Sequence, residues 1–151
     1  MPSPLTPGVA GYIARHHVMT LATQGAGGPW AAAVFYVWLG GELIFLSSPK
    51  SRHGVDLARD ARCAATIQDQ PEDWRRVEGV QIEGVAEPLR SPALERAREA
   101  YAERFSFVRP GGAPAAIAAA LARVQWYRLR IVRLRFIDNA RGFGSRPLEA
   151  V

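Results

Sequence analysis

Short apolar segments, either alternating or continuous, occupy most of the chain, and turn residues separate them. Segments of this length that are rich in valine, isoleucine and aromatic residues are typical of β-strands. The pattern predicts strands over residues 18–23, 30–39, 42–46, 62–68, 77–88 and 125–137. Because residues 30–39 are apolar nearly throughout, we expect both faces of that strand to be covered.

Helical spacing appears before and between these strands. A single stripe predicts a helix near the N-terminus, formed by Leu5, Val9, Tyr12 and Ile13. A short helix is expected over residues 55–59. Ser91 and Pro92 predict the N-cap and first turn of a longer helix, and an alanine-rich helix is expected over residues 114–124.

The connections predict how the strands pair. Gly40 and Gly41 are a hairpin signal, and residues 25–29 form a glycine-rich turn that leads into a strand. Hairpins favour antiparallel pairing, and a sheet of about six strands avoids exposed edges by closing into a barrel. We therefore expect one domain over residues 1–151, with a mainly β, α+β fold: a six-stranded antiparallel barrel with flanking helices.

Charge narrows the choice of partner. Nineteen basic residues against fourteen acidic residues leave a net charge of +5, which suits nucleic acid, an acidic lipid surface or a phosphorylated small molecule. No apolar run approaches the ~20 residues that cross a bilayer, and no signal segment opens the chain. We expect a cytoplasmic protein without a membrane partner. His16 and His17 lack a carboxylate or cysteine at metal-ligand spacing, so no metal site is expected.

One polar segment carries most of the candidate chemistry. Three hydroxyl and three potentially cationic side chains lie within seven residues between an apolar strand and the short helix, in the order Ser47, Ser48, Pro49, Lys50, Ser51, Arg52 and His53. A phosphate group needs several donors and compensating positive charge, and a helix N-terminus adds oriented backbone N–H groups. The segment is a candidate phosphate site, and an ordinary polar turn is the competing interpretation.

The same segment resembles a known family. A strand that ends in Ser47, followed after a spacer by Ser51, Arg52 and His53, is similar to the phosphate-binding pattern of the pyridoxamine-phosphate-oxidase-like FMN-binding split-barrel superfamily. In that family the last position is lysine, which His53 replaces. The resemblance implies a split barrel that holds FMN through residues 47–53.

Further positions follow from this resemblance. The strand that lies along the flavin ring in the family corresponds to residues 32–36, which makes Ala33, Val34 and Tyr36 candidate flavin contacts. The family also contributes a glutamine to the flavin of the other subunit, and Gln81 is the matching candidate. The resemblance thus implies a homodimer in which each flavin contacts both protomers.

Two further motifs indicate a smaller branch of the superfamily. They are Arg52-His53-Gly54 after the phosphate segment and a closing Asp138-Asn139-Ala140-Arg141-Gly142-Phe143. The tryptophan-and-arginine signature with which the oxidase proper holds its vitamin B6 substrate is not found over residues 126–151. Oxidation of pyridoxamine phosphate is therefore not expected.

Three functions remain open. We favour an FMN-dependent oxidoreductase that acts on an unidentified small-molecule substrate or electron donor, with catalytic residues that the sequence does not name. A non-catalytic protein that binds flavin, deazaflavin or haem is the second, because the superfamily includes such members. A basic β-barrel that binds nucleic acid is the third, because the last strand carries Arg128, Arg130, Arg133 and Arg135. For these arginines we favour a solvated strand face over a nucleic-acid site.

Overall fold

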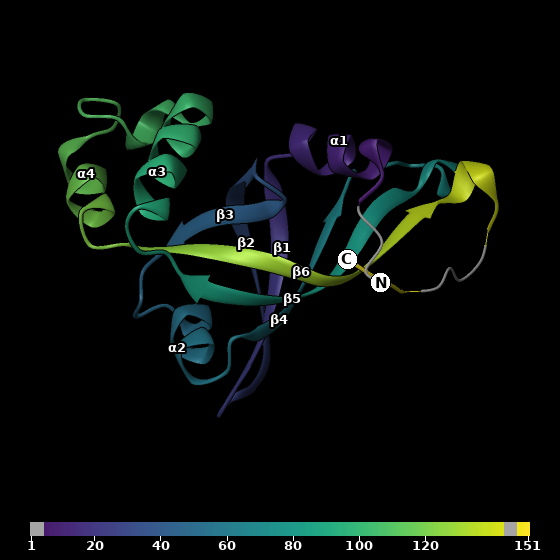
Figure 1. Cartoon of the computed structure of the whole chain (residues 1–151), viewed down its shortest axis with the longest axis horizontal. Coiled ribbons are helices and arrows are strands. Elements are labelled where there is room, and N and C mark those ends of the chain that lie inside the picture. The colour runs from purple at the N-terminus through teal and green to yellow at the C-terminus, as the bar shows by residue number, and fades with distance from the viewer. Residues whose placement is uncertain (1–4, 144–147) are drawn as a thin grey trace.

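Six antiparallel strands close into a barrel in the computed structural model, which describes residues 5–143 and 148–151 (Figure 1). The barrel strands are β1 (Val18–Gly25), β2 (Gly28–Leu39), β3 (Glu42–Ser47), β4 (Arg62–Gln68), β5 (Glu78–Pro88) and β6 (Gln125–Asp138). They follow the order β3-β2-β1-β4-β5-β6, and β6 pairs back onto β3. The short β7 (Glu149–Ala150) adds to the edge of β6. The predicted mainly β, antiparallel barrel is confirmed.

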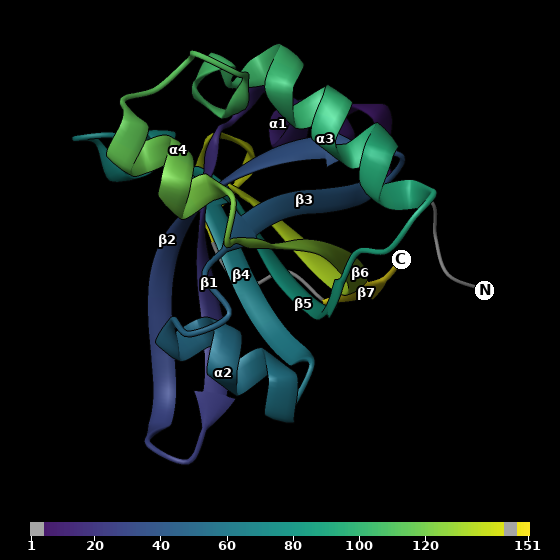
Figure 2. The same cartoon turned by 90° about the vertical axis from the view of Figure 1, so that its left-hand side faces the viewer.

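The helices lie at the two ends of the barrel. They are α1 (Pro7–Arg15), α2 (Arg52–Arg59), α3 (Ala93–Arg104) and α4 (Ala115–Leu121), with 3-10 turns η1 (Trp74–Arg76), η2 (Ser106–Val108) and η3 (Asn139–Arg141). Figure 2 shows α2 beside the end where the β1–β2 hairpin turns, and α3 and α4 at the opposite end. Among the described residues, no helix is both long and apolar enough to span a membrane.

Two apolar clusters hold these elements together. The first fills the barrel and includes the inward residues Met19, Leu21, Tyr36, Phe45, Ile67, Val80, Tyr127 and Leu129. The second lies outside the barrel, where α3 covers β2, β3 and β6, and includes Val37, Ile44, Ala97, Tyr101, Phe105 and Trp126. Burial of large apolar side chains contributes about 1.5–3 kcal/mol each, so both clusters fix their elements firmly.

A bulge in β6 turns its arginines to one side. Glu83 pairs with Arg133 while Gly84 pairs with Ile131, so Val132 is the extra residue. Simple alternation would divide the four arginines of β6 between its two faces. With the bulge, Leu129, Ile131 and Leu134 all point inward, and the arginines on both sides of the bulge take outward positions.

Several predicted boundaries differ from the structure. Helix α2 begins three residues before the predicted Val55, because the Ser51 side chain caps it. Ser91 was expected to cap α3, but its hydroxyl instead donates to Glu95 Oε1, at 2.5 Å. Strand β2 was expected to be covered on both faces, yet the side chains of Ala33 and Phe35 are exposed.

Candidate functional site

The loop between β3 and α2 is organised by its own hydroxyl groups. Ser51 Oγ accepts from Gly54 N at 3.1 Å and donates to Ser48 O at 2.6 Å. Lys50 N donates to Ser48 Oγ at 3.2 Å. A side chain at Gly54 would place a Cβ 2.6 Å from Ser48 O, which explains the glycine. These contacts fix the first turn of α2. Gly54 N already donates to Ser51 Oγ, so an anion can bind only the earlier N–H groups of this turn.

Ser47 and His53 meet beneath this loop. Ser47 Oγ lies 2.7 Å from His53 Nε2, and the Ser47 side chain is buried. Burial lowers the pKa of His53, and the negative charge of Asp56 opposes this shift in part. His53 is therefore neutral near pH 7, whereas the family lysine it replaces carries a fixed charge.

Arg52 projects from the first turn of α2 onto the β1–β2 hairpin. Its Nη2 donates to Gly27 O at 3.0 Å, and its guanidinium carbon lies 4.4 Å from the centroid of the Trp30 ring. The Arg52 side chain is exposed, so its remaining N–H groups face solvent. Lys50 is exposed as well, and the two side chains supply the positive charge of the site.

Asp56 anchors α2 to the barrel. Its carboxylate is buried, and Thr23 Oγ1 donates to Asp56 Oδ2 at 2.8 Å. A Cβ on Gly25 would lie only 1.8 Å from Asp56 Oδ1, so the helix can approach β1 only because residue 25 is glycine. No local signal in the sequence links these residues, since Thr23 and Asp56 lie 33 positions apart.

The candidate ring contacts on β2 divide between the two faces of the strand. The side chains of Val34 and Tyr36 are buried inside the barrel, and Tyr36 OH donates to Ile13 O at 2.6 Å. Both side chains belong to the barrel core, so the expected flavin contact through backbone and side chain stays a prediction for the backbone alone. Ala33 and Phe35 are exposed on the outer face.

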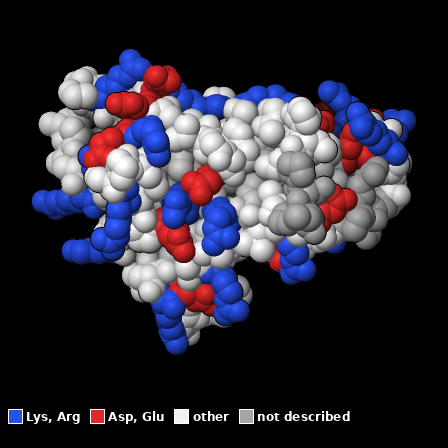
Figure 3. Space-filling model, viewed as in Figure 1, with Lys and Arg blue, Asp and Glu red and all other residues white. Residues whose placement is uncertain are grey.

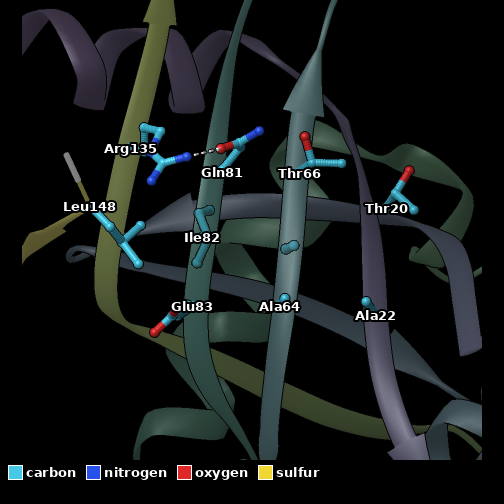
Figure 4. Close-up of a pocket in the computed structure, with 10 residues that line it drawn as sticks. Thr20, Ala22, Ala64, Thr66, Gln81, Ile82, Glu83, Arg135 and Leu148 are labelled. Carbon is cyan, nitrogen blue, oxygen red and sulfur yellow. Dashed lines mark hydrogen bonds between the residues drawn. The ribbon is translucent and has the colours of Figure 1, made fainter. Parts of the chain in front are cut away.

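Gln81 lines a separate cavity on the outer face of the barrel (Figure 4). The cavity has a volume of about 420 Å³, and none of residues 47–53 contributes to its lining. Its floor is made of small side chains from β1 and β4, and Arg135 and Leu148 form a wall beside Gln81. Arg135 Nη1 donates to Gln81 Oε1 at 3.4 Å.

Strand register continues this floor into a wider surface, with small side chains on β2, β1 and β4 and long polar side chains on β5 and β6. Ala33 pairs with Thr20, Thr20 with Thr66, Thr66 with Gln81, and Gln81 with Arg135. A parallel row joins Ala31, Ala22, Ala64, Glu83 and Arg133. We call these two rows the outer-face rows. They join Ala33 and Gln81 on one face of the same barrel.

Arg135 is a candidate that the sequence did not single out for the flavin site. Its Nε is buried and has no hydrogen-bond partner among the described residues. A buried donor without a partner carries a free-energy cost that a ligand or a second chain can relieve. The neighbouring Arg133 differs, because it forms an ion pair with Glu83.

The closing motif of the chain builds a turn instead of joining the loop over residues 47–53. Asp138 Oδ1 accepts from Ala140 N at 3.0 Å, and Asn139 Nδ2 donates to Trp74 O at 2.8 Å. Gly142 adopts a φ of 133°, which favours glycine, and the Phe143 ring then lies 5.5 Å from the Trp74 ring. The motif ties the end of β6 to the turn that precedes β5.

The surface charge distribution bears on the nucleic-acid alternative. In the face shown in Figure 3, basic side chains are dispersed and interleaved with acidic ones. Arg128 lies 3.9 Å from Glu42 and 3.6 Å from Glu87. Ion pairs of this kind reduce the positive potential that binds a phosphate backbone, so β6 is a weak candidate for that role. The described residues contain no cluster of metal-ligating side chains.

Sequence and structure comparisons place the chain among known proteins. Residues 5–138 match the pyridoxamine 5′-phosphate oxidase family. The chain is 31% identical over 142 residues to UPF0306 protein YhbP of Escherichia coli strain SMS-3-5, with 93% of this chain and 89% of the relative covered.

Solved structures share the same fold. A heme binding protein from Mycobacterium smegmatis superposes with a TM-score of 0.73 at 28% identity, over 97% of this chain and 60% of that one. An FAD-binding protein from Mesorhizobium loti superposes with a TM-score of 0.66 at 17% identity, over 87% of this chain and 94% of that one. The likeness to the second protein concerns the fold alone.

Proposed function

We propose that this chain, which belongs to the pyridoxamine 5′-phosphate oxidase family, binds FMN. In this proposal it transfers electrons between the flavin and a small molecule. The observation that carries the proposal is the loop over residues 47–53, where hydroxyls and cations surround the N-terminus of α2. This donor set fits a phosphate group, which needs N–H and O–H donors together with positive charge.

Each residue of the loop has a distinct role in the proposal. The backbone N–H groups of the first turn of α2 bind phosphate oxygens, and Ser51 keeps that turn in place. Arg52 supplies a guanidinium fork, and Lys50 adds charge from the loop. Ser47 and Ser48 offer hydroxyls, and His53 orients Ser47 through the contact of 2.7 Å between Nε2 and Oγ.

FMN supplies the electron transfer itself, and the protein binds and orients it. Ala33 and the backbone at Val34 and Tyr36 would support the ring from the exposed face of β2. The missing vitamin B6 signature argues for a substrate other than pyridoxamine phosphate. The substrate is a small molecule, and a separate reductant can serve as electron donor.

A homodimer completes the site in this proposal. The outer-face rows present alanine and threonine side chains to solvent, with Val18 and Phe35 beside them at 43% and 50% exposure. A sheet face that exposes small and large apolar side chains together is typical of a protein interface. Pairing of two such faces would bring Gln81 and Arg135 of one protomer to the flavin held by the loop of the other.

Haem binding without catalysis is the second candidate, and one observation favours it. The Mycobacterium smegmatis protein described as heme binding is 28% identical to this chain and shares its fold. Against it, the loop over residues 47–53 offers hydroxyl and cationic donors, which suit a phosphate more than iron.

The absorption spectrum of the protein purified from cells tests the proposal. FMN gives flavin bands in the visible range, and haem gives a Soret band. A Soret band at one haem per chain, combined with no uptake of added FMN, would replace the first candidate by the second.

A further inference from the structure

A second cavity lies at the other end of the barrel from α2. It is bordered by α3, η2, α4 and the start of β6, is open to solvent on one side, and has a volume of about 410 Å³. Small-molecule sites in proteins span about 300–1,000 Å³, so this space suits a small organic ligand. None of residues 47–53 lines it, and neither does Gln81.

The walls of this cavity are mainly apolar. Phe107, Val108, Leu121 and Trp126 contribute the larger apolar side chains, and Ala118 of α4 contributes a small one. Trp126 is 8% exposed and packs edge-on against Tyr101, with ring centroids 5.2 Å apart. A rigid aromatic wall binds a planar or apolar ligand at little cost in conformational entropy.

Two guanidinium groups border the same space. The Arg98 guanidinium carbon lies 5.9 Å from the centroid of the Trp126 ring. Among the described residues, Arg109 forms one side-chain hydrogen bond, from Nε to Ala102 O at 2.8 Å, so its terminal nitrogens can donate to a ligand. Within the described residues, no carboxylate lies within 4.0 Å of either guanidinium.

Glu95 is the acidic group that faces Arg98, because it lies on α3 one turn earlier. Its carboxylate accepts from Ser91 Oγ, and Arg98 acts on it only through weaker electrostatic attraction. The Arg98 guanidinium therefore retains N–H groups that can donate hydrogen bonds to an anionic ligand. Guanidinium groups bind carboxylates in a planar, bidentate manner, which a carboxylate entering the cavity can satisfy.

We propose that this cavity binds a small amphipathic carboxylate, with its aromatic or aliphatic body against Trp126 and Phe107 and its carboxylate on Arg98 and Arg109. The site needs neither the flavin nor a second copy of the chain. It goes beyond the proposed function and can be tested on protein without any cofactor.

The competing occupant is a second copy of this chain, since α4 exposes apolar side chains to solvent. Ile117 is 48% exposed but does not line the cavity, so the exposed side of α4 and the cavity are separate features. The two arginines at the rim favour an anion over an apolar protein surface.

Calorimetric titration with 1-naphthylacetate tests the proposal, with the uncharged analogue 2-(1-naphthyl)ethanol for comparison. We expect the carboxylate to bind at one site per chain and the alcohol to bind at least about tenfold more weakly. The double variant Arg98→Gln/Arg109→Gln should lose about 100-fold in affinity for the carboxylate, because each charged hydrogen-bond partner contributes about tenfold.

Matched variants separate the cavity from general charge and from the surface of α4. Arg96→Gln/Arg123→Gln removes the same charge from exposed positions outside the lining and should retain affinity. Ala118→Phe fills the cavity and should abolish binding, whereas Ala119→Phe on the exposed side of α4 should not.

Three results would overturn the proposal. They are the absence of binding at millimolar 1-naphthylacetate, equal affinity in the Arg98→Gln/Arg109→Gln variant, and unchanged binding after Ala118→Phe. An affinity that falls as the protein concentration rises would assign the cavity to a second copy of the chain instead.

Discussion

The guanidinium group of Arg52 lies over the indole ring of Trp30, with 4.4 Å between the guanidinium carbon and the ring centroid. This cation–π contact joins the first turn of α2 to the β1–β2 hairpin. Trp30 is 42% exposed and Arg52 is exposed as well, so the pair lies at the protein surface. The arrangement holds the main phosphate ligand of the proposed site in place before any ligand binds, which lowers the entropy cost of binding.

Arg52→Ala is predicted to weaken FMN binding by about tenfold to 100-fold, because a charged hydrogen bond to phosphate contributes about 1.5–3 kcal/mol. Fluorescence titration with FMN measures the change. Arg59→Ala, at the exposed far end of α2, is the control and should bind FMN like the unmodified protein. Equal affinity in the two variants would remove Arg52 from the site.

Gly25→Ala is predicted to destabilise the protein by about 1–3 kcal/mol, because the new Cβ meets the buried Asp56 carboxylate and α2 must shift. Urea unfolding measures the free energy. Gly11→Ala is a matched control, since a Cβ at Gly11 meets no atom of the described residues within 4 Å. If Gly25→Ala unfolds at the same urea concentration as Gly11→Ala, Asp56 does not fix α2 against β1.

The pH dependence of stability is predicted to include a contribution from His53. Burial lowers its pKa in the folded state below the ordinary value of 6.5, so the folded protein binds fewer protons there than the unfolded chain. This contribution is present above pH 6.5 and is lost as the pH falls below 6.5 through the lowered pKa.

Urea unfolding at pH 7.5 and pH 5.5 measures this loss. The loss of stability between pH 7.5 and pH 5.5 should be smaller in His53→Asn than in the unmodified protein. The pKa of His17 is also lowered, by burial and by the charge of Arg104, so His17→Asn serves as a second reference. An identical acid loss with and without His53 would contradict its assignment as a buried neutral group.

The element pattern could largely be predicted from the sequence, because alternation and turn residues act locally. Residues 62–68 form a strand with the predicted bounds, and Gly40 and Gly41 turn the β2–β3 hairpin with positive φ angles of 61° and 87°. The start of α2 was missed because its first residues are polar. Apolar periodicity begins only at Val55, and the cap at Ser51 determines the true beginning.

The site was harder to predict, because its geometry depends on contacts between distant segments. Alternation on β2 places Val34 and Tyr36 on one face, but only closure of the barrel decides that this face is inside. The hydrogen bond between Thr23 and Asp56 likewise depends on how two distant segments pack together. The four arginines of β6 share a side through a bulge at Val132, which the alternation pattern does not locate.

Ala64→Arg is predicted to convert a dimer into monomers, because it places a charge in the middle of the outer-face rows. It should also weaken FMN binding, since Gln81 and Arg135 of the partner could no longer reach the flavin. Sedimentation velocity measures the mass. Ala58→Arg, exposed on α2, is the control. If the unmodified protein is monomeric and still binds one FMN per chain, the dimeric site is refuted.

The visible difference spectrum of the cofactor-free protein titrated with FMN tests the central claim most directly. The account predicts a perturbed flavin spectrum that saturates at one FMN per chain, and a weaker response in Arg52→Ala. Free FMN with an unperturbed spectrum throughout the titration would contradict it.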